Sequence, residues 1–223
     1  MPRTIAIGDI HGCSQALAAL LDAIDPQPDD HLITLGDVVD RGPGSRQAVD
    51  LLLDVQTRCR LTPILGNHEE MMLDVVAHGR SPEFWLRFGG ADTLDSYGFA
   101  GRLDVIPAEH IEFLASGRDY LETESHFFVH ANYAPGVPLA DQQRLELRWL
   151  SLDDSLPGPH ISGKKAVVGH TPDRSGEILA LNHLTCIDTY CYGGMWLSAA
   201  DVGSGRIWQA NQRGELRTSK GGR

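Results

Sequence analysis

Apolar and polar residues are arranged along the first third of the chain in a way that predicts strands followed by amphipathic helices. A short apolar run at Thr4–Gly8 is followed by apolar residues at intervals of three and four between Leu17 and Ile24, the period of one helix face. Two further strand-like runs, His31–Leu35 and Leu61–Leu65, are each followed by a similar helical pattern. This order is typical of a largely parallel sheet covered by helices, because parallel strands need a crossover between them.

The pattern changes after residue 80. The segment to residue 124 is irregular, and the final third contains strand-like runs without helices between them: Phe127–His130, Ala166–Gly169, Leu184–Asp188, Met195–Ala200 and Arg206–Gln209. Strands that follow one another in this way suggest a second sheet packed on the first. The sequence therefore predicts an α/β fold, a single-domain α/β sandwich of two packed mixed sheets flanked by helices, over residues 1–217. A disordered polar tail is expected at residues 218–223.

Composition and charge exclude several classes of protein. The 223 residues are 42% hydrophobic, as in ordinary globular proteins, and no apolar run is long enough to span a bilayer. The formal net charge of −11 makes a nucleic-acid or membrane partner unexpected. Four cysteines and no export signal favour a cytoplasmic location. An anionic substrate would need a source of positive charge within the site.

The residues that carry chemistry follow the first three predicted strands. The sequences GDIHG, GDVVDRG and GNHE come after the first, second and third strand, and Asp9, Asp37 and Asn67 are 28 and 30 residues apart. That spacing is about one β-α-β unit. Open α/β sheets bind ligands at the carboxyl edge of their strands, so we expect the three motifs to lie side by side there.

The residue types in these motifs suit a metal centre. Carboxylate and amide oxygens with imidazole nitrogens are ligands for divalent ions such as Mn²⁺, Fe²⁺ or Zn²⁺. A carboxylate from the central strand can bridge two ions, which lie roughly 3.5–4 Å apart in two-metal sites. Taken singly, Asp37 also fits a turn, and Asn67 with Glu70 fits a helix capping box. The coincidence at three strand ends favours the metal centre.

Together with later segments, these motifs resemble a known family. GDIHG, GDVVDRG and GNHE are followed by FVHAN, VVGHTP and the run Ile187–Thr189. In this order they resemble the phosphoprotein phosphatase (PPP) family of metallophosphatases, within the calcineurin-like metallophosphoesterases. The resemblance covers Ile5 to Leu197 and is strongest to the short bacterial and phage members. It implies the α/β sandwich architecture of that superfamily.

The resemblance implies a site with two divalent metal ions, Mn²⁺ being preferred and Fe²⁺ or Zn²⁺ the alternatives. One ion has three ligands, and the second has four and shares the central carboxylate. The ligands are Asp9, His11 and Asp37 for the first ion, and Asp37, Asn67, His130 and His170 for the second. In the mechanism that the resemblance implies, a hydroxide that bridges the metals attacks phosphorus directly.

The resemblance also assigns catalytic roles to residues that are not metal ligands. His68 is expected to protonate the leaving oxygen, and Asp40 to orient the His68 ring. Arg41 is expected to hold the phosphoryl oxygens. A second phosphate-binding arginine is expected between the two late histidines, with Arg148 as the candidate and Arg144 as the alternative.

Two substrate classes compete. The main hypothesis is a phosphomonoesterase, a Ser/Thr phosphoprotein phosphatase that also accepts phosphotyrosine; the alternative is a symmetrical diadenosine tetraphosphate hydrolase. Asp40 and Glu69 resemble the protein phosphatases, whereas Gly42–Ser45 and Tyr192–Gly194 resemble the nucleotide hydrolases. Expected substrates are therefore a phosphorylated protein or a small phosphoester.

Two further features bear on this choice. A non-catalytic phosphate-binding module is disfavoured because His68, Arg41 and the metal-type residues are all present. Tyr190 departs from the family pattern, since relatives commonly have glycine after Ile-Asp-Thr. A tyrosine there either narrows the floor of the pocket or offers a hydroxyl to the substrate.

Overall fold

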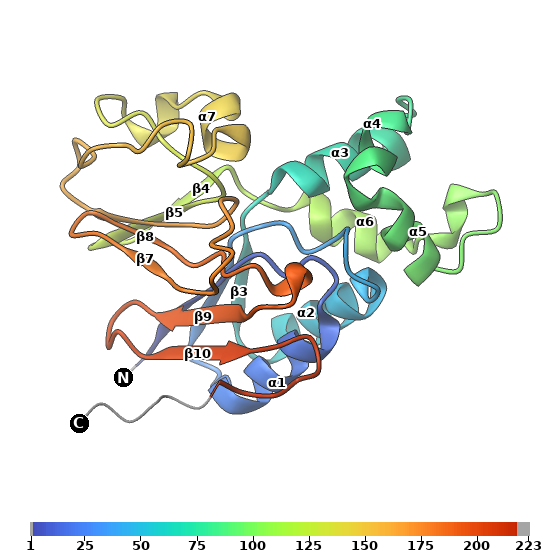
Figure 1. Ribbon diagram of the computed structural model, residues 1–223, viewed down its shortest axis with the longest axis horizontal. Coiled ribbons are helices and arrows are strands. Elements are labelled where there is room, and N and C mark those ends of the chain that lie inside the picture. The colour runs from blue at the N-terminus through green and yellow to red at the C-terminus, as the bar shows by residue number, and fades with distance from the viewer. Residues whose placement is uncertain (1, 218–223) are drawn as a thin grey trace.

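Figure 1 shows the two sheets of the computed structural model, which describes residues 2–217. The sheets share one apolar layer, in which Ala6 and Ile33 of the first sheet pack with Phe128 and Val167 of the second. Helices flank the outer sides of the sheets, so the α/β sandwich predicted from the sequence is confirmed. The tail predicted at 218–223 lies outside the described residues.

The first sheet contains the three strands predicted near the N-terminus and two from the end of the chain. The strands are β1 (Thr4–Ile7), β2 (His31–Thr34), β3 (Arg60–Pro63), β9 (Leu197–Asp201) and β10 (Ile207–Ala210). Their order is β10-β9-β1-β2-β3. β1, β2 and β3 are parallel, so their carboxyl ends meet at one edge, as expected.

The position of β9 and β10 corrects one expectation from the sequence. We expected all late strands to form the second sheet, but β9 pairs antiparallel with β1, with Ala6 opposite Ala200, and β10 pairs with β9. Every residue of β9 is buried. A strand buried on both faces belongs in the interior of a sheet, and the place between β1 and β10 provides this cover.

The second sheet contains the remaining strands. They are β4 (Tyr120–Glu122), β5 (His126–Val129), β6 (Lys165–Val168), β7 (Leu179–Ala180) and β8 (Leu184–Cys186). Their order is β4-β5-β6-β8-β7, with β5, β6 and β8 parallel and the two edge strands antiparallel to their neighbours. The parallel strands bring a second set of carboxyl ends to the site.

The helices cover the outer faces. They are α1 (Ser14–Ile24), α2 (Ser45–Arg58), α3 (Asn67–Val76), α4 (Glu83–Trp85), α5 (Ala91–Ser96), α6 (Ala108–Ala115) and α7 (Arg144–Trp149), with short turns η1 (Leu86–Gly90), η2 (Leu103–Val105), η3 (Leu139–Asp141) and η4 (Cys191–Gly193). The apolar face predicted for α1 is buried against the first sheet, and Leu147 of α7 packs on the second. No helix within residues 2–217 is long and apolar enough to cross a membrane.

Candidate metal centre

The turns that follow the parallel strands of both sheets converge on one buried cluster. The predicted ligands lie after β1 (Asp9, His11), β2 (Asp37), β3 (Asn67), β5 (His130) and β6 (His170). Except for the partly buried His170, these side chains are buried. Burying so many polar groups is costly unless they are paired or bind a cation.

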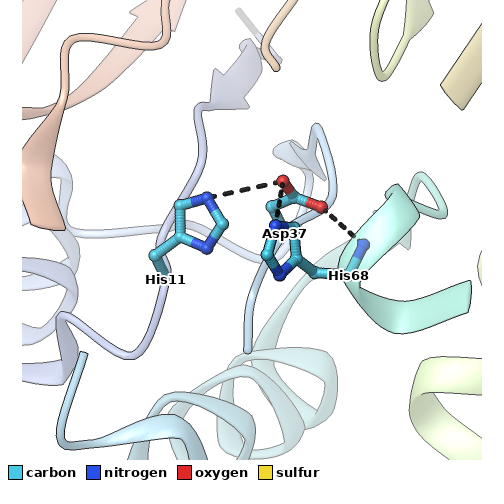
Figure 2. A group of neighbouring side chains, drawn as sticks. All are labelled: His11, Asp37 and His68. Carbon is cyan, nitrogen blue, oxygen red and sulfur yellow. Dashed lines mark hydrogen bonds and ion pairs between the residues drawn. The ribbon is translucent and has the colours of Figure 1, made fainter. Parts of the chain in front are cut away.

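His11, Asp37 and His68 form one three-residue group whose possible ligand atoms lie within 4.8 Å of one another, close enough to hold one metal ion (Figure 2). The Asp37 carboxylate lies between the rings, with Oδ2 3.4 Å from His11 Nε2 and 3.9 Å from His68 Nε2. The backbone N–H of His68 donates to Asp37 Oδ1 at 3.1 Å and fixes this carboxylate.

Asp37, His130 and His170 form the second group. His130 Nε2 is 3.0 Å from Asn67 Oδ1 and 3.1 Å from His170 Nδ1, and His170 Nδ1 is 3.1 Å from Asn67 Oδ1. Asp37 Oδ1 lies 3.4 Å from His130 Nε2. Asp37 is therefore common to both groups, as a bridging ligand would be.

In each of the three predicted histidine ligands, the ring nitrogen that faces away from the cluster forms a hydrogen bond with a backbone carbonyl. His11 Nδ1 lies 3.0 Å from the oxygen of Val39, and His130 Nδ1 lies 2.7 Å from that of Leu35. A carbonyl accepts only, so each of these nitrogens carries the proton and the opposite nitrogen turns a lone pair to the cluster. His170 is reversed, because its Nε2 donates to the carbonyl of Trp149 at 3.1 Å.

These lone pairs test whether the residues fit metal ions. The facing atoms of His130 and His170 in the second group, and of the adjacent Asn67, are all acceptors, and acceptors about 3 Å apart repel one another unless a cation lies between them. Burial lowers the pKa of His130, and that of His170 to about 4, which keeps both rings neutral. Neutral imidazole with amide and carboxylate oxygens is a donor set that fits a divalent transition-metal ion.

Asp188 belongs to the run Ile187–Thr189 but not to the predicted ligand set. It is buried two residues after the end of β8, next to Asp9, and burial raises its pKa to about 7. Burial and the nearby Asp188 also raise the pKa of Asp9, whose carboxylate accepts the backbone N–H of His170 at 3.0 Å. Two adjacent buried carboxylates again indicate a place for positive charge.

His68, a member of the first group, forms a buried pair with Asp40. His68 Nδ1 donates to Asp40 Oδ2 at 2.7 Å, while His68 Nε2 has no hydrogen-bond partner among residues 2–217. Although burial lowers the pKa of His68, the carboxylates of Asp37 and Asp40 raise it above its ordinary value. A ring whose protonated form is favoured, and whose Nε2 is unpartnered beside the cluster, is suited to donate a proton.

Asp40 is held by residues from the irregular middle segment. The indole N–H of Trp85 lies 3.0 Å from both oxygens of Asp40, and the hydroxyl of Thr93 donates at 2.7 Å. Both residues lie in the segment between residues 80 and 124 in which the sequence shows no regular apolar pattern. Trp85 and Thr93 hold the carboxylate that binds His68, so they are placed to position this ring through Asp40.

Replacing Trp85 by Phe tests this positioning role. The change removes a hydrogen bond to a buried carboxylate, so we expect the free energy of unfolding to fall by about 1.5–3 kcal/mol. Turnover should fall by about 10- to 100-fold, the usual effect of losing an outer partner of a site residue. Urea unfolding and steady-state kinetics measure both quantities. Trp208→Phe is the matched control, because the buried Trp208 Nε1 has no partner among the described residues; an equal loss of turnover there would contradict the role.

Glu69, rather than Glu70, caps α3. One Glu69 oxygen accepts the backbone N–H groups of Gly66 and Asp37, at 3.1 and 2.7 Å, and the other accepts that of Val38 at 2.7 Å. The capping box that we considered for Asn67 and Glu70 is therefore wrong. Glu69 joins the turns after β2 and β3, which sets the spacing of the ligands that they carry.

The two candidate arginines occupy different surroundings. Arg41 Nη1 is 3.1 Å from His11 Nε2, and its guanidinium carbon lies 4.4 Å from the centre of the Tyr192 ring. Arg148 is buried and donates to Glu70 at 2.7 Å and to Asp119. A phosphate contact would require Arg148 to exchange one of these carboxylates for the substrate. The exposed alternative, Arg144, also pairs with Glu70.

Backbone strain is concentrated at the centre. Seven non-glycine residues within 2–217 have positive φ, a region that side chains usually disfavour. One of them, Asp25, ends α1. The others are His11, Asp37, Asp40, Arg41, His170 and Tyr190. Such outliers cluster at functional sites, where the surrounding structure holds them.

Comparison with known sequences identifies the relatives of this chain. A family described as calcineurin-like phosphoesterase matches residues 2–194. The chain is 31% identical over 194 residues to the symmetrical bis(5'-nucleosyl)-tetraphosphatase of Stutzerimonas stutzeri (84% of this chain, 65% of the relative). It is 34% identical over 133 residues to the enzyme of that name from Janthinobacterium sp. (59% and 44%). It is 42% identical over 86 residues to serine/threonine-protein phosphatase 1 of Salmonella typhimurium (38% and 37%).

The aligned parts thus span less than two thirds of the length of each of these relatives. Among solved structures, a candidate diadenosine tetraphosphatase superposes with a TM-score of 0.71 at 24% identity, covering 94% of this chain and 95% of that one. The cold-active protein-tyrosine phosphatase of a psychrophilic Shewanella superposes with a TM-score of 0.65 at 16% identity, covering 98% and 80%. At these identities the structures establish a common fold.

Proposed function

This chain belongs to the calcineurin-like phosphoesterase family of metal-dependent hydrolases, and from that membership we propose that it cleaves dinucleoside tetraphosphates symmetrically. The observation that carries the proposal is the alignment with the Stutzerimonas stutzeri enzyme of that activity, which extends over 84% of this chain. The alignment with the serine/threonine phosphatase covers 38%. The hypothesis that the sequence motifs left as the alternative is therefore better supported than the main one.

We propose that the cluster binds two divalent ions, with Mn²⁺ as the metal and Fe²⁺ or Zn²⁺ as alternatives. Asp9, His11 and Asp37 would hold one, and Asp37, Asn67, His130 and His170 the other. When bound, such ions supply positive charge to the phosphate and lower the pKa of a water nucleophile. They also answer how a protein with a net charge of −11 attracts an anion.

The remaining steps fall to side chains of this chain. We propose that Arg41 binds the oxygens of the phosphate under attack and neutralises charge that develops on them. The water oxygen bonds to phosphorus as the bond from that phosphorus to the leaving diphosphate breaks. The Nε2–H of His68 points at the cluster and is available to the leaving oxygen, with Asp40 holding the ring. The products are two nucleoside diphosphates.

A Ser/Thr phosphoprotein phosphatase is the second candidate, favoured by the His68–Asp40 pair. An alkoxide leaves as a strong base and needs a proton in the transition state. A nucleoside diphosphate is a much weaker base and needs less help. The Asp40 carboxylate binds His68, Trp85 and Thr93. This network holds His68 as a proton donor, which an alkoxide leaving group needs more than a diphosphate does.

A comparison of two substrates tests the proposal. Metal-stripped protein, with and without added Mn²⁺, is incubated with equal concentrations of diadenosine tetraphosphate and a phosphoserine peptide. We expect Mn²⁺-dependent formation of ADP as the sole nucleotide product, because attack falls at the centre of the chain of phosphates. Formation of AMP and ATP would contradict symmetrical cleavage. Phosphate release from the peptide alone would replace the proposed function by the second candidate.

A further inference from the structure

A cavity of about 510 Å³ lies on the Asp188 side of the metal cluster. Asp188, which neighbours Asp9, forms part of its lining. Thr171, the residue after the predicted ligand His170, forms another part. The cavity therefore adjoins the candidate metal centre through Asp188 and Thr171, and its volume is within the range of small-molecule sites, about 300–1,000 Å³.

The lining combines apolar and acidic side chains. Leu152, Leu156 and Leu179 contribute apolar surface. The Leu156 side chain is 59% exposed, so a ligand in the cavity would cover apolar surface that is now open to solvent. Asp153 also lines the cavity and forms no ion pair within residues 2–217. Leucines can sandwich a planar base, and a carboxylate accepts hydrogen bonds from ribose hydroxyls, as in dinucleotide sites.

Arg174 supplies the positive charge of this cavity. It is exposed, lines the cavity, and makes no ion pair among the described residues. Its guanidinium carbon lies 6.0 Å from the centre of the Tyr190 ring. The Tyr190 and Tyr192 rings are 4.8 Å apart, and Arg41 covers Tyr192. A continuous row of side chains thus connects Arg41 at the centre with Arg174 at the cavity.

The backbone of Tyr190 shows that this row is held in place. Its φ of 60° and ψ of 44° are left-handed, a conformation that is unfavourable for a residue with a side chain. The ring packs on Gly193, where an added Cβ would lie 2.0 Å from a ring carbon. In the family that this sequence resembles, this position is commonly glycine. Glycine would adopt the left-handed conformation without strain, and the Tyr190 ring between Tyr192 and Arg174 would be absent.

We propose that this cavity binds one nucleoside of the substrate and that Arg174 binds a phosphate next to it. The inference rests on the proposed function. Arg41 would bind the phosphate that is attacked, and the tyrosine row would set the position of Arg174 along the rest of the polyphosphate. A single phosphoryl group on a serine side chain has no second phosphate for Arg174, so these contacts favour the longer substrate.

Two variants test this subsite without touching the proposed catalytic residues. Arg174→Gln removes the charge, and Leu156→Glu places a negative charge on the wall. We expect each to raise KM for diadenosine tetraphosphate about tenfold, equivalent to about 1.4 kcal/mol. The kcat/KM for p-nitrophenyl phosphate should stay within about twofold, because that substrate has no nucleoside to bind. Ile161→Glu is the matched control, because Ile161 is also 59% exposed but does not line the cavity.

Equilibrium binding gives a second readout. Calorimetry on the Mn²⁺-loaded protein should show that both variants weaken ADP about tenfold and leave inorganic phosphate unchanged. Variants that retain wild-type KM and ADP affinity would reject the subsite, as would an equal effect of Ile161→Glu. Failure of the wild-type protein to cleave the dinucleotide would instead reject the proposed function, so the two failures are distinguishable.

Discussion

Replacing His68 by Asn is expected to lower kcat for phenyl phosphate by about 10²–10⁴-fold, the usual contribution of a general acid. The loss should be smaller for p-nitrophenyl phosphate, because its leaving group is a weaker base and needs less protonation. The expected result follows from the unpartnered Nε2 of His68 and from the Asp40 carboxylate that raises the pKa of this ring. Steady-state kinetics with both substrates separate the two effects.

The metal content of this variant distinguishes an acid from a ligand. His68 also belongs to the group with His11 and Asp37. If His68 acts as an acid, the variant should bind as many metal ions as the wild-type protein by atomic emission. Loss of one ion, or equal losses for the two aryl phosphates, would contradict the assignment. His78→Asn serves as a control, because His78 is exposed after the end of α3.

Replacing Asp37 by Asn is expected to remove most activity by depriving the centre of its shared carboxylate. Asp37 contacts histidines of both groups at 3.4 Å, so one change weakens both ion sites. Metal ions contribute several kcal/mol of transition-state stabilisation, so we expect turnover to fall by about 10³-fold or more. The amide oxygen can still accept the N–H of His68, which preserves the local fold.

Metal titration identifies the cause of this loss. The variant should bind fewer ions than the wild-type protein, and added Mn²⁺ should not restore its activity. Wild-type protein treated with a chelator should lose activity to a similar extent and regain it with Mn²⁺. A full complement of ions in the variant would contradict the bridging role. Asp22→Asn, on the exposed face of α1, controls for the loss of one negative charge.

The convergence of the metal-type residues was predictable because it depends on regular structure. Asp9, Asp37 and Asn67 follow parallel strands of one sheet, and strand spacing fixes how close such residues come. His130 and His170 follow parallel strands of the other sheet. The role of Asp37 as the common member required no side-chain detail, because β2 lies between β1 and β3.

The parts that the sequence did not reveal depend on tertiary packing in irregular segments. Trp85 contacts Asp40, which lies 45 residues earlier in the chain. Its helix, α4, is too short to show a periodic pattern of apolar residues. Arg148 finds its carboxylate partners 78 and 29 residues away. The place of β9 in the first sheet was not predicted, because the apolar pattern of a strand does not specify which sheet or which neighbouring strand it joins.

The contacts that form the metal centre also determine when it can appear during folding. The N–H of His170 reaches Asp9 across 161 residues of chain, and His130 reaches the carbonyl of Leu35 across 95. Loops of this length are entropically costly to close, and such contacts form slowly. Both sheets must therefore be docked before the ligands meet. We therefore expect any capture of metal to be a late event of folding, because a chain that ends before β6 lacks the turn with His170 that the proposed second ion needs.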